Sequence, residues 1–226
     1  MKKFSFIIFD LDGLMVDTEP IYRRAFNLVL EACNAKYVYD VQEYGRTMTG
    51  RHMLENSERA RERFGLPQTA QEITDAHRGI FNLLLADAEN IRAMPGLDEL
   101  LAYLEAQKIP DAIASSARPE QIHVILRGLN LHHQFQAIVG NDGTLKPKPA
   151  PDVYLRAAAA LGANPAETLA LEDSPSGVRA AKAAGMSVFA VPSEYTIMHE
   201  FPDADAVYPD LRRVRDALAQ IQNQKS

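Results

Sequence analysis

The stretch FSFIIFDLDGLMVD, residues 4–17, places an apolar run directly before two acidic residues. A nearly continuous apolar run is typical of a strand buried on both faces, as in a parallel sheet covered by helices. Asp10 ends the run, and Asp12 follows after one residue, with Gly13 behind it. Ligands of open parallel sheets bind just beyond the carboxyl ends of the strands. The stretch therefore predicts a buried strand that presents two carboxylates at a binding edge.

The composition is that of a globular protein with a large core. The chain has 226 residues, 46% hydrophobic and 24% charged. Its net charge of -6, without a Lys/Arg run, argues against a nucleic-acid partner. Cys33 is the only cysteine, which excludes an intrachain disulfide and favours a reducing compartment. The N-terminal apolar run is too short for a signal peptide, and no stretch is long enough to span a bilayer, so we expect a cytoplasmic protein without a membrane partner.

The rest of the chain predicts a helical insertion within an alternating α/β pattern. Apolar residues at helical spacing predict helices over about 20–33, 53–64 and 70–85. From Met94 onward, helices alternate with predicted strands over 111–115, 136–139, 168–171, 187–191 and 205–208. This alternation predicts a doubly wound, Rossmann-like parallel sheet. We expect an α/β catalytic core formed by residues 1–14 and 91–226, with a helical cap, residues 15–90, inserted after the first strand.

Chemically active side chains follow several of the predicted strands. They are Asp10, Asp12, Ser115, Ser116, Glu172 and Asp173, with Lys146 and Lys148 in a proline-rich loop between the third and fourth strands. Because parallel strands end at one edge of the sheet, these side chains should meet in one crevice. Carboxylates there could hold Mg²⁺, and a lysine and a serine hydroxyl could hold a substrate phosphate. One aspartate could act as a nucleophile on phosphorus, and an acid two residues on could handle the proton.

The order of these motifs resembles that of the haloacid dehalogenase-like phosphohydrolases. The shared motifs are Asp10-Leu11-Asp12-Gly13 with Asp17-Thr18-Glu19, the strand end at Ser115, Lys148-Pro149-Ala150-Pro151-Asp152, and Glu172-Asp173-Ser174 with Gly177. The resemblance implies that Asp10 is the nucleophile and Asp12 the general acid/base. An aspartate at position 12 favours phosphoryl transfer over dehalogenation.

The same resemblance implies a set of binding residues. Ser115 and Lys148 would bind the transferring phosphoryl group. Mg²⁺ would be held by Asp10, the backbone carbonyl of Asp12 and Asp173, with Glu172 in or next to the coordination shell.

Some assignments have rivals in the sequence itself. Lys146 competes with Lys148, which is preferred because the family pattern Lys-Pro-x-Pro-Asp falls on it. Ser116 competes with Ser115, either of which could instead cap the following turn. A calcium loop is the alternative for the first motif, but such a loop has its glycine at the sixth position and a helix before it. The histidines show no metal-ligand spacing.

The helical insertion resembles the small cap of this family, which would close over the site, exclude water and contact the leaving group. Hinges are expected near residues 14–19 and 90–96. The segment Thr47-Met48-Thr49-Gly50-Arg51 occupies the place of the cap's specificity loop. Arg51 or His52 could therefore reach the substrate.

The favoured function is a Mg²⁺-dependent phosphatase of a small phosphorylated metabolite, with no obligate protein partner. The first motif and Met94-Pro95-Gly96 resemble those of sugar-phosphate and nucleotide-phosphate hydrolases, and residues 37–40 with Ser115-Ser116-Ala117-Arg118 resemble pseudouridine-monophosphate phosphatases. A β-phosphoglucomutase is the alternative, although that family usually has a histidine where this chain has Tyr22 and a lysine where it has Thr49. A phospho-receiver module is a distant alternative, which would need neither a cap nor Asp12.

Overall fold

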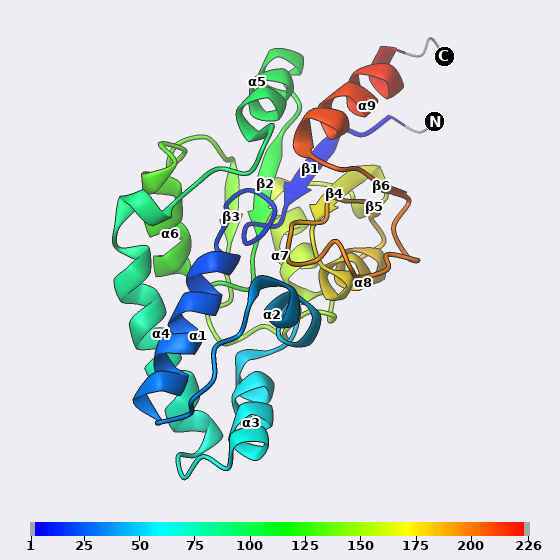
Figure 1. The fold of residues 1–226 in the computed structure, drawn as a ribbon. Coiled ribbons are helices and arrows are strands. Elements are labelled where there is room, and N and C mark those ends of the chain that lie inside the picture. The colour runs from blue at the N-terminus through cyan, green and yellow to red at the C-terminus, as the bar shows by residue number, and fades with distance from the viewer. Residues whose placement is uncertain (1–2, 224–226) are drawn as a thin grey trace.

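The computed structural model describes residues 3–223 and contains a sheet of six parallel strands (Figure 1). The strands are β1 (Phe6–Phe9), β2 (Asp111–Ala114), β3 (Ala137–Val139), β4 (Thr168–Glu172), β5 (Ser187–Ala190) and β6 (Ala206–Val207). Their order across the sheet is β3-β2-β1-β4-β5-β6, with every pairing parallel. The predicted doubly wound fold is confirmed, and the quoted stretch provides a central strand.

Helices cover both faces of the sheet. They are α5 (Leu97–Gln107), α6 (Pro119–Gly128), α7 (Asp152–Leu161), α8 (Pro175–Ala183) and α9 (Leu211–Asn223). Ile7 and Phe9 pack in one hydrophobic cluster with residues of α5, α6 and α9. Ile8 packs in another, with alanines of α7 and α8. Successive strand side chains point to opposite faces, so a strand covered on both sides must be apolar throughout.

The register of the sheet fixes where the acidic residues lie. Phe9, the last residue of β1, is level with Ile113 of β2 and Leu171 of β4. Asp10 therefore follows β1 at the edge where β2 and β4 also end. The polar residues after all three strands are brought to one place by backbone pairing alone.

Four of the α-helices between β1 and β2 lie beyond the carboxyl ends of the strands (Figure 1). They are α1 (Glu19–Ala32), α2 (Val41–Thr47), α3 (Met53–Phe64) and α4 (Ala70–Leu85), followed by the 3₁₀ turn η1 (Ala88–Asn90). Helix α4 packs against both α1 and α3 around a hydrophobic cluster of their own. The two connections to the sheet run side by side, because Asp17 N donates to Arg92 O and Met94 N donates to Met15 O, each over 2.9 Å.

The sequence predicted α1, α3 and α4 to within one residue, but it did not predict α2 or the 3₁₀ turns η1 and η2 (Pro165–Glu167). Helix α2 has only seven residues, and its glycine weakens the helical pattern. Its start is set by Asp40, whose side chain accepts a hydrogen bond from Glu43 N over 2.7 Å. The domain boundaries at residues 14–15 and 90–91 stay a prediction, as do the hinges.

A loop of the sheet domain reaches into the helical segment. Tyr195, which follows β5, is buried in the hydrophobic cluster of the helices, and Arg23 Nε donates to its hydroxyl over 3.1 Å. His199 Nε2 lies 3.1 Å from Gly45 O. A Cβ at residue 45 would lie 2.5 Å from Tyr195 O, which is closer than packing allows. Glycine at position 45 therefore permits the contact between α2 and this loop.

Substitution of Gly45 by alanine should destabilise the protein. The new methyl group would displace Tyr195, at a cost of about 1–3 kcal/mol in the free energy of unfolding. Gly79→Ala is the matched control, because Gly79 is exposed in α4 and has open space around its missing Cβ. That change should stabilise the protein by about 0.5–1 kcal/mol. Urea unfolding measures both, and a Gly45→Ala variant as stable as the wild type would contradict the prediction.

His77 is a buried titratable group in the core of the helical segment. Its Nε2 lies 3.1 Å from Tyr22 O, and since a carbonyl oxygen only accepts, Nε2 carries the proton. The ring stacks near Tyr22, with centroids 5.8 Å apart and planes inclined by 6°. Burial lowers the pKa of His77 from 6.5 to about 4.

This lowered pKa makes the contribution of His77 to stability fall in mild acid. Between pH 6.5 and 4 the unfolded chain binds a proton at His77 that the folded protein excludes, so the part of the free energy of unfolding that depends on His77 decreases as the pH falls and levels off below pH 4. The full loss is about 3 kcal/mol. His77→Gln keeps an N–H donor and should reduce this loss. Urea unfolding of both proteins at pH 7.5, 6, 5 and 4 measures the difference; parallel pH profiles would refute the assignment.

Candidate functional site

A cavity of about 310 Å³ lies between the carboxyl edge of the sheet and the helical segment. From the sheet side it is lined by Asp10, Asp12, Ser116, Asn141, Lys148, Asp173 and Ser174. From the helical side it is lined by Glu19, Tyr22, Tyr44, Met48, Thr49, Arg51, His52 and Asn56. The cavity lies at the edge where the strands end, and the helices form its opposite wall. Of the residues predicted to meet in one crevice, Ser115, Glu172 and Lys146 do not line it.

Lys148 lies between two carboxylates at the floor of this cavity. Its Nζ is 2.7 Å from Asp10 Oδ1 and 2.6 Å from Glu172 Oε1, and it also lies 3.4 Å from Ala114 O. Burial alone lowers the pKa of Lys148, but the two carboxylates raise it above its usual value. The lysine is therefore a fixed cation. Lys146 is exposed, so the structure brings Lys148 and not its rival to the acids.

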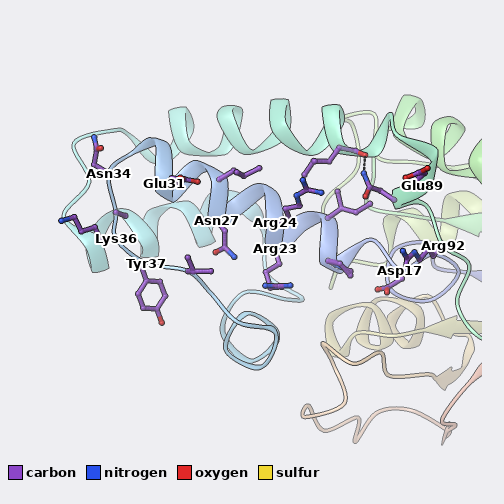
Figure 2. Close-up of a pocket in the computed structure, with 17 residues that line it drawn as sticks. Asp17, Arg23, Arg24, Asn27, Glu31, Asn34, Lys36, Tyr37, Glu89 and Arg92 are labelled. Carbon is purple, nitrogen blue, oxygen red and sulfur yellow. Dashed lines mark hydrogen bonds between the residues drawn. The ribbon is translucent and has the colours of Figure 1, made fainter.

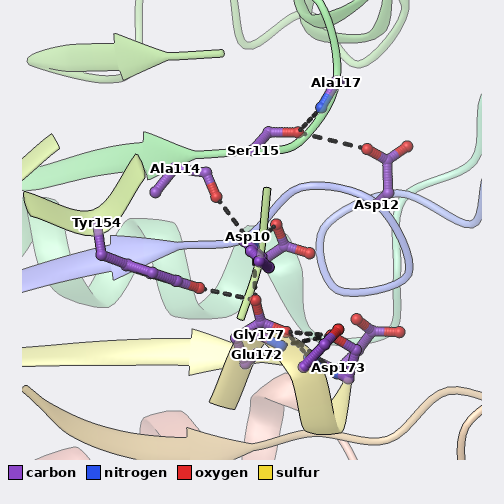
Figure 3. Close-up of polar contacts among 12 residues, drawn as sticks. Asp10, Asp12, Ala114, Ser115, Ala117, Tyr154, Glu172, Asp173 and Gly177 are labelled. Atoms are coloured by element: carbon purple, nitrogen blue, oxygen red, sulfur yellow. Dashed lines mark hydrogen bonds and ion pairs between the residues drawn. The ribbon is translucent and has the colours of Figure 1, made fainter. Parts of the chain in front are cut away.

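Both carboxylate oxygens of Glu172 are occupied by donors of the protein (Figure 3). Oε1 accepts from Lys148 and from the hydroxyl of Tyr154 over 2.8 Å. Oε2 accepts from Asp173 N, Ser174 N and Ser174 Oγ over 3.0–3.1 Å. Glu172 is fully buried. Its geometry suits a residue that holds Lys148 and the start of α8 in place.

Asp12 is turned toward β2 and the start of the helical segment. Thr18 Oγ1 donates to its Oδ1 over 2.8 Å, and Ser115 Oγ donates to its Oδ2 over 3.4 Å. Figure 3 shows Asp12 and Ser115 facing each other. Burial raises the pKa of Asp12 above its usual value. A carboxyl group with a raised pKa is suited to hold and transfer a proton.

Asp10, Glu172 and Asp173 form a buried acidic cluster within the described residues, with one oxygen of each within 4.8 Å of the others. Asp173 lies against Gly13, where a Cβ would come within 2.3 Å of Asp173 Oδ2 and where φ is +79°. Burial raises the pKa of Asp10 to about 7, and burial followed by repulsion from Glu172 and Asp10 raises that of Asp173. Such an arrangement of oxygens suits a hard divalent cation, which would offset this repulsion.

The side chains of Ser115 and Ser116, the predicted phosphate contacts, and of Arg51, the predicted cap contact, differ in their exposure to solvent. Ser115 is fully buried, and its Oγ also accepts from Ala117 N over 2.9 Å. Ser116 is exposed and lines the cavity. Arg51 lines it too, but its guanidinium pairs with Glu55 over 2.9 Å and its side chain is 44% exposed. All three residues lie at or near the cavity. Phosphate binding by Ser115 and Ser116 and substrate contact by Arg51 stay predictions.

Sequence reasoning missed several residues that form the site. Tyr154 lies two positions after the lysine-proline motif, and Thr18 and Glu19 were noted only as parts of a motif. Thr18 and Glu19 follow Asp17, and Tyr154 follows Asp152, so their closeness to the motifs could have indicated them. The contacts that they make, however, depend on the fold. Tyr44 belongs to the short helix α2, which gave no sequence signal.

A second cavity, of about 790 Å³, lies along the outer side of α1 (Figure 2). Labelled side chains there include Arg23, Arg24, Asn27 and Glu31 of α1 and Arg92, which lies between η1 and α5. Arg23 is already bonded to Tyr195 and to Tyr39 O. The cavity lacks the convergent acids of the first one, which we therefore take as the functional site.

Known proteins match this chain over most of its length. A family model described as haloacid dehalogenase-like hydrolase matches residues 7–191. Protein CbbY of Rhodobacter capsulatus is 32% identical over 211 residues, covering 91% of this chain and 92% of that protein. A probable pseudouridine-5'-phosphatase of Drosophila melanogaster is 32% identical, covering 85% and 83%, and β-phosphoglucomutase of Bacillus subtilis is 32% identical, covering 80% of each chain.

Solved structures show the same fold. CbbY from Rhodobacter sphaeroides in complex with phosphate superposes with a TM-score of 0.80 at 30% identity, covering 93% of this chain and 96% of that one. No helix among residues 3–223 is long and apolar enough to cross a membrane. The family match over most of the chain, relatives named phosphatases and the shared fold agree with the expected enzyme class, a phosphoric monoester hydrolase. The chain belongs to the haloacid dehalogenase-like hydrolases.

Proposed function

We propose that the protein is a Mg²⁺-dependent phosphatase of a small phosphorylated metabolite, a sugar phosphate or a nucleoside monophosphate, which acts through an aspartyl-phosphate on Asp10. The observation that carries this proposal is the ion pair of Lys148 with Asp10 Oδ1. The pair orients the Asp10 carboxylate at the cavity floor, with Asp12 and Asp173 lining the same cavity.

The first step is attack on phosphorus by the carboxylate of Asp10. A bond forms between the Asp10 oxygen and phosphorus while the ester P–O bond breaks. Asp12, whose pKa is raised by burial, delivers its proton to the departing oxygen, so the alcohol leaves uncharged. Lys148 and the hydroxyl groups after β2 hold the phosphoryl oxygens.

The second step regenerates the enzyme. A water molecule attacks the phosphorus of the aspartyl-phosphate, Asp12 takes its proton, and the bond to Asp10 breaks with release of inorganic phosphate. Thr18 keeps the Asp12 carboxyl group in position for both transfers.

The acidic cluster fits Mg²⁺. Asp10 and Asp173 would hold the ion with the backbone carbonyl of Asp12, and Glu172, whose oxygens are occupied, would support them from next to the coordination shell. When bound, the ion supplies positive charge that neutralises the phosphoryl oxygens.

Loss of the nucleophile should abolish phosphatase activity. In the presence of Mg²⁺, Asp10→Asn should reduce phosphate release by at least about 10³-fold, because the amide cannot form the aspartyl-phosphate. Asp12→Asn should slow turnover by about 10²–10⁴-fold. The screen uses phosphorylated sugars and nucleotides. Appreciable activity of Asp10→Asn would refute the nucleophile assignment.

The same screen tests the mutase alternative, which the B. subtilis relative keeps open. With β-glucose 1-phosphate, the proposed phosphatase releases inorganic phosphate. Formation of glucose 6-phosphate without free phosphate would establish a mutase. In both cases Asp10 is expected to be the phosphorylated residue, so the Asp10→Asn result and the product analysis are independent.

Mg²⁺ should stabilise the folded protein in a pH-dependent manner. The pKa of Asp10 is about 7 and that of Asp173 is raised, so an ion that needs both carboxylates ionised must displace protons at lower pH. The rise in Tm caused by Mg²⁺ should therefore be larger at pH 8 than at pH 6. Asp173→Asn should remove most of this rise without lowering the Tm of the metal-free protein. An undiminished rise in that variant would contradict the predicted ligand.

A further inference from the structure

Tyr154 is a buried tyrosine that contacts the charged floor of the cavity and has no part in the proposed chemistry. It belongs to α7 and is fully buried. Its hydroxyl donates to Glu172 Oε1 over 2.8 Å, and Figure 3 shows the side chain pointing at that carboxylate. Lys148 Nζ lies 4.9 Å from the centroid of the ring, within the range of a cation–π interaction. Tyr154 therefore contacts both partners of the ion pair between Lys148 and Glu172.

The hydrogen bonds of Glu172 occupy every acceptor site of its carboxylate. A carboxylate has about four lone-pair sites, which its two oxygens share. Oε1 accepts from Lys148 over 2.6 Å and from Tyr154 over 2.8 Å. Oε2 accepts from Asp173 N and from both donors of Ser174, over 3.0–3.1 Å. No lone pair of Glu172 is left for a cation.

The other two acids of the cluster keep free oxygens. Lys148 occupies Asp10 Oδ1, but Asp10 Oδ2 and both carboxylate oxygens of Asp173 accept no hydrogen bond from another residue within 3–223. The three acids therefore differ in their capacity to bind an ion, although one oxygen of each lies within 4.8 Å of the others. For Oε1 of Glu172 the difference depends on Tyr154, because without that hydroxyl one lone pair would be free.

The number of free oxygens affects which cation a site prefers. Mg²⁺ is octahedral, keeps several waters and is usually held by about one or two carboxylates, whereas Ca²⁺ takes roughly six to eight oxygens in a flexible geometry. A third carboxylate oxygen within reach of the ion would favour Ca²⁺. A Glu172 carboxylate that turned to the ion would also hold Lys148 less firmly against Asp10.

We propose that Tyr154 is a positioning residue that keeps Glu172 bound to Lys148 and out of the coordination of the cation. Its hydroxyl fills the acceptor site on Oε1 that would otherwise bind the ion. The ammonium group of Lys148 then stays directed at Asp10, and the ion keeps positions for water and for phosphoryl oxygens. Tyr154 does not line the cavity, so it acts through Glu172. This inference rests on the proposed function, because it concerns the cation and the nucleophile of that reaction.

The test measures cation preference in a variant that lacks only the hydroxyl. Tyr154→Phe keeps the ring and its contact with Lys148. Calorimetric titration of the metal-free protein gives the Kd of Mg²⁺ and the Kd of Ca²⁺. In Tyr154→Phe the ratio of the Kd for Ca²⁺ to the Kd for Mg²⁺ should fall by about 10-fold, a change typical of the loss of a partner next to a coordination shell.

Tyr103→Phe is the matched control. Tyr103 lies in α5, does not line the cavity, and its hydroxyl makes no hydrogen bond to another residue within 3–223. This variant also loses one phenolic hydroxyl, and it should leave the ratio of Kd values unchanged.

Kinetics give a second readout for Tyr154→Phe. With Mg²⁺ and the best phosphate ester found in the screen, kcat should fall by about 10-fold while KM stays within about 3-fold, because a positioned Lys148 acts mainly on the transition state. A hydroxyl that served stability alone would lower the Tm and leave the ratio of Kd values as it is. That outcome would refute the positioning role.

The wild-type protein tests the inference without any variant. It should bind Mg²⁺ more tightly than Ca²⁺, and equal or tighter binding of Ca²⁺ would overturn the inference. An unchanged ratio in Tyr154→Phe would overturn it too, while hydrolysis of esters by the wild type would leave the phosphatase standing. If the wild type with Mg²⁺ hydrolyses no phosphate ester but the ratio falls in Tyr154→Phe, the proposed function fails and the role of Tyr154 in cation preference stands.

Discussion

The ion pair of Lys148 with Asp10 and Glu172 is the contact on which the site depends. Three carboxylates meet at the ends of β1 and β4, and among the described residues only this lysine is placed between them. Charges removed from water are costly unless they are paired and hydrogen-bonded. One lysine cannot neutralise three acids, so the fold retains an excess of negative charge. Such an excess would favour a divalent cation at this site.

Glu172 links the ion pair with Lys148 to the neighbouring helices. Through Lys148 it fixes the loop before α7, through Tyr154 it fixes α7 itself, and through Ser174 it fixes the N-terminus of α8. Gly177, in the first turn of α8, lies so close that a Cβ would overlap the Glu172 carboxylate. One buried carboxylate thus sets the relative positions of a cation, two helices and the adjacent Asp173. Its value lies in this rigidity, since a site that must position a reacting phosphorus tolerates little movement.

The sequence predicted the helices and strands that have a clear local pattern, and it predicted the residues that parallel strand ends bring together. The apolar run before Asp10 predicted a buried strand, and parallel strand ends predicted that Asp10, Ser115 and Glu172 would meet. Helices α3 and α4 were predicted at their observed bounds, because their apolar periodicity is strong. Helix α2 was missed because a short helix with a glycine leaves no such periodicity. The pairing of Tyr195 with Arg23 was also unpredictable, since 172 residues separate the two in sequence.

The segment that follows β1 couples the chemistry to the helical wall. Thr18, which fixes Asp12, is the residue immediately before α1, and Glu19 and Tyr22 lie in the first turn of that helix. The segment that leads from η1 back to α5 is hydrogen-bonded to the residues before α1, because Asp17 N donates to Arg92 O. A displacement of α1 relative to the sheet would therefore move the helical wall of the cavity and also change the hydrogen bond that orients Asp12. If the helices close over a bound ester, Asp12 and this wall reach their positions together. Asp12 would then be in position for proton transfer only when the ester fits the closed cavity, which limits hydrolysis of poorly fitting esters.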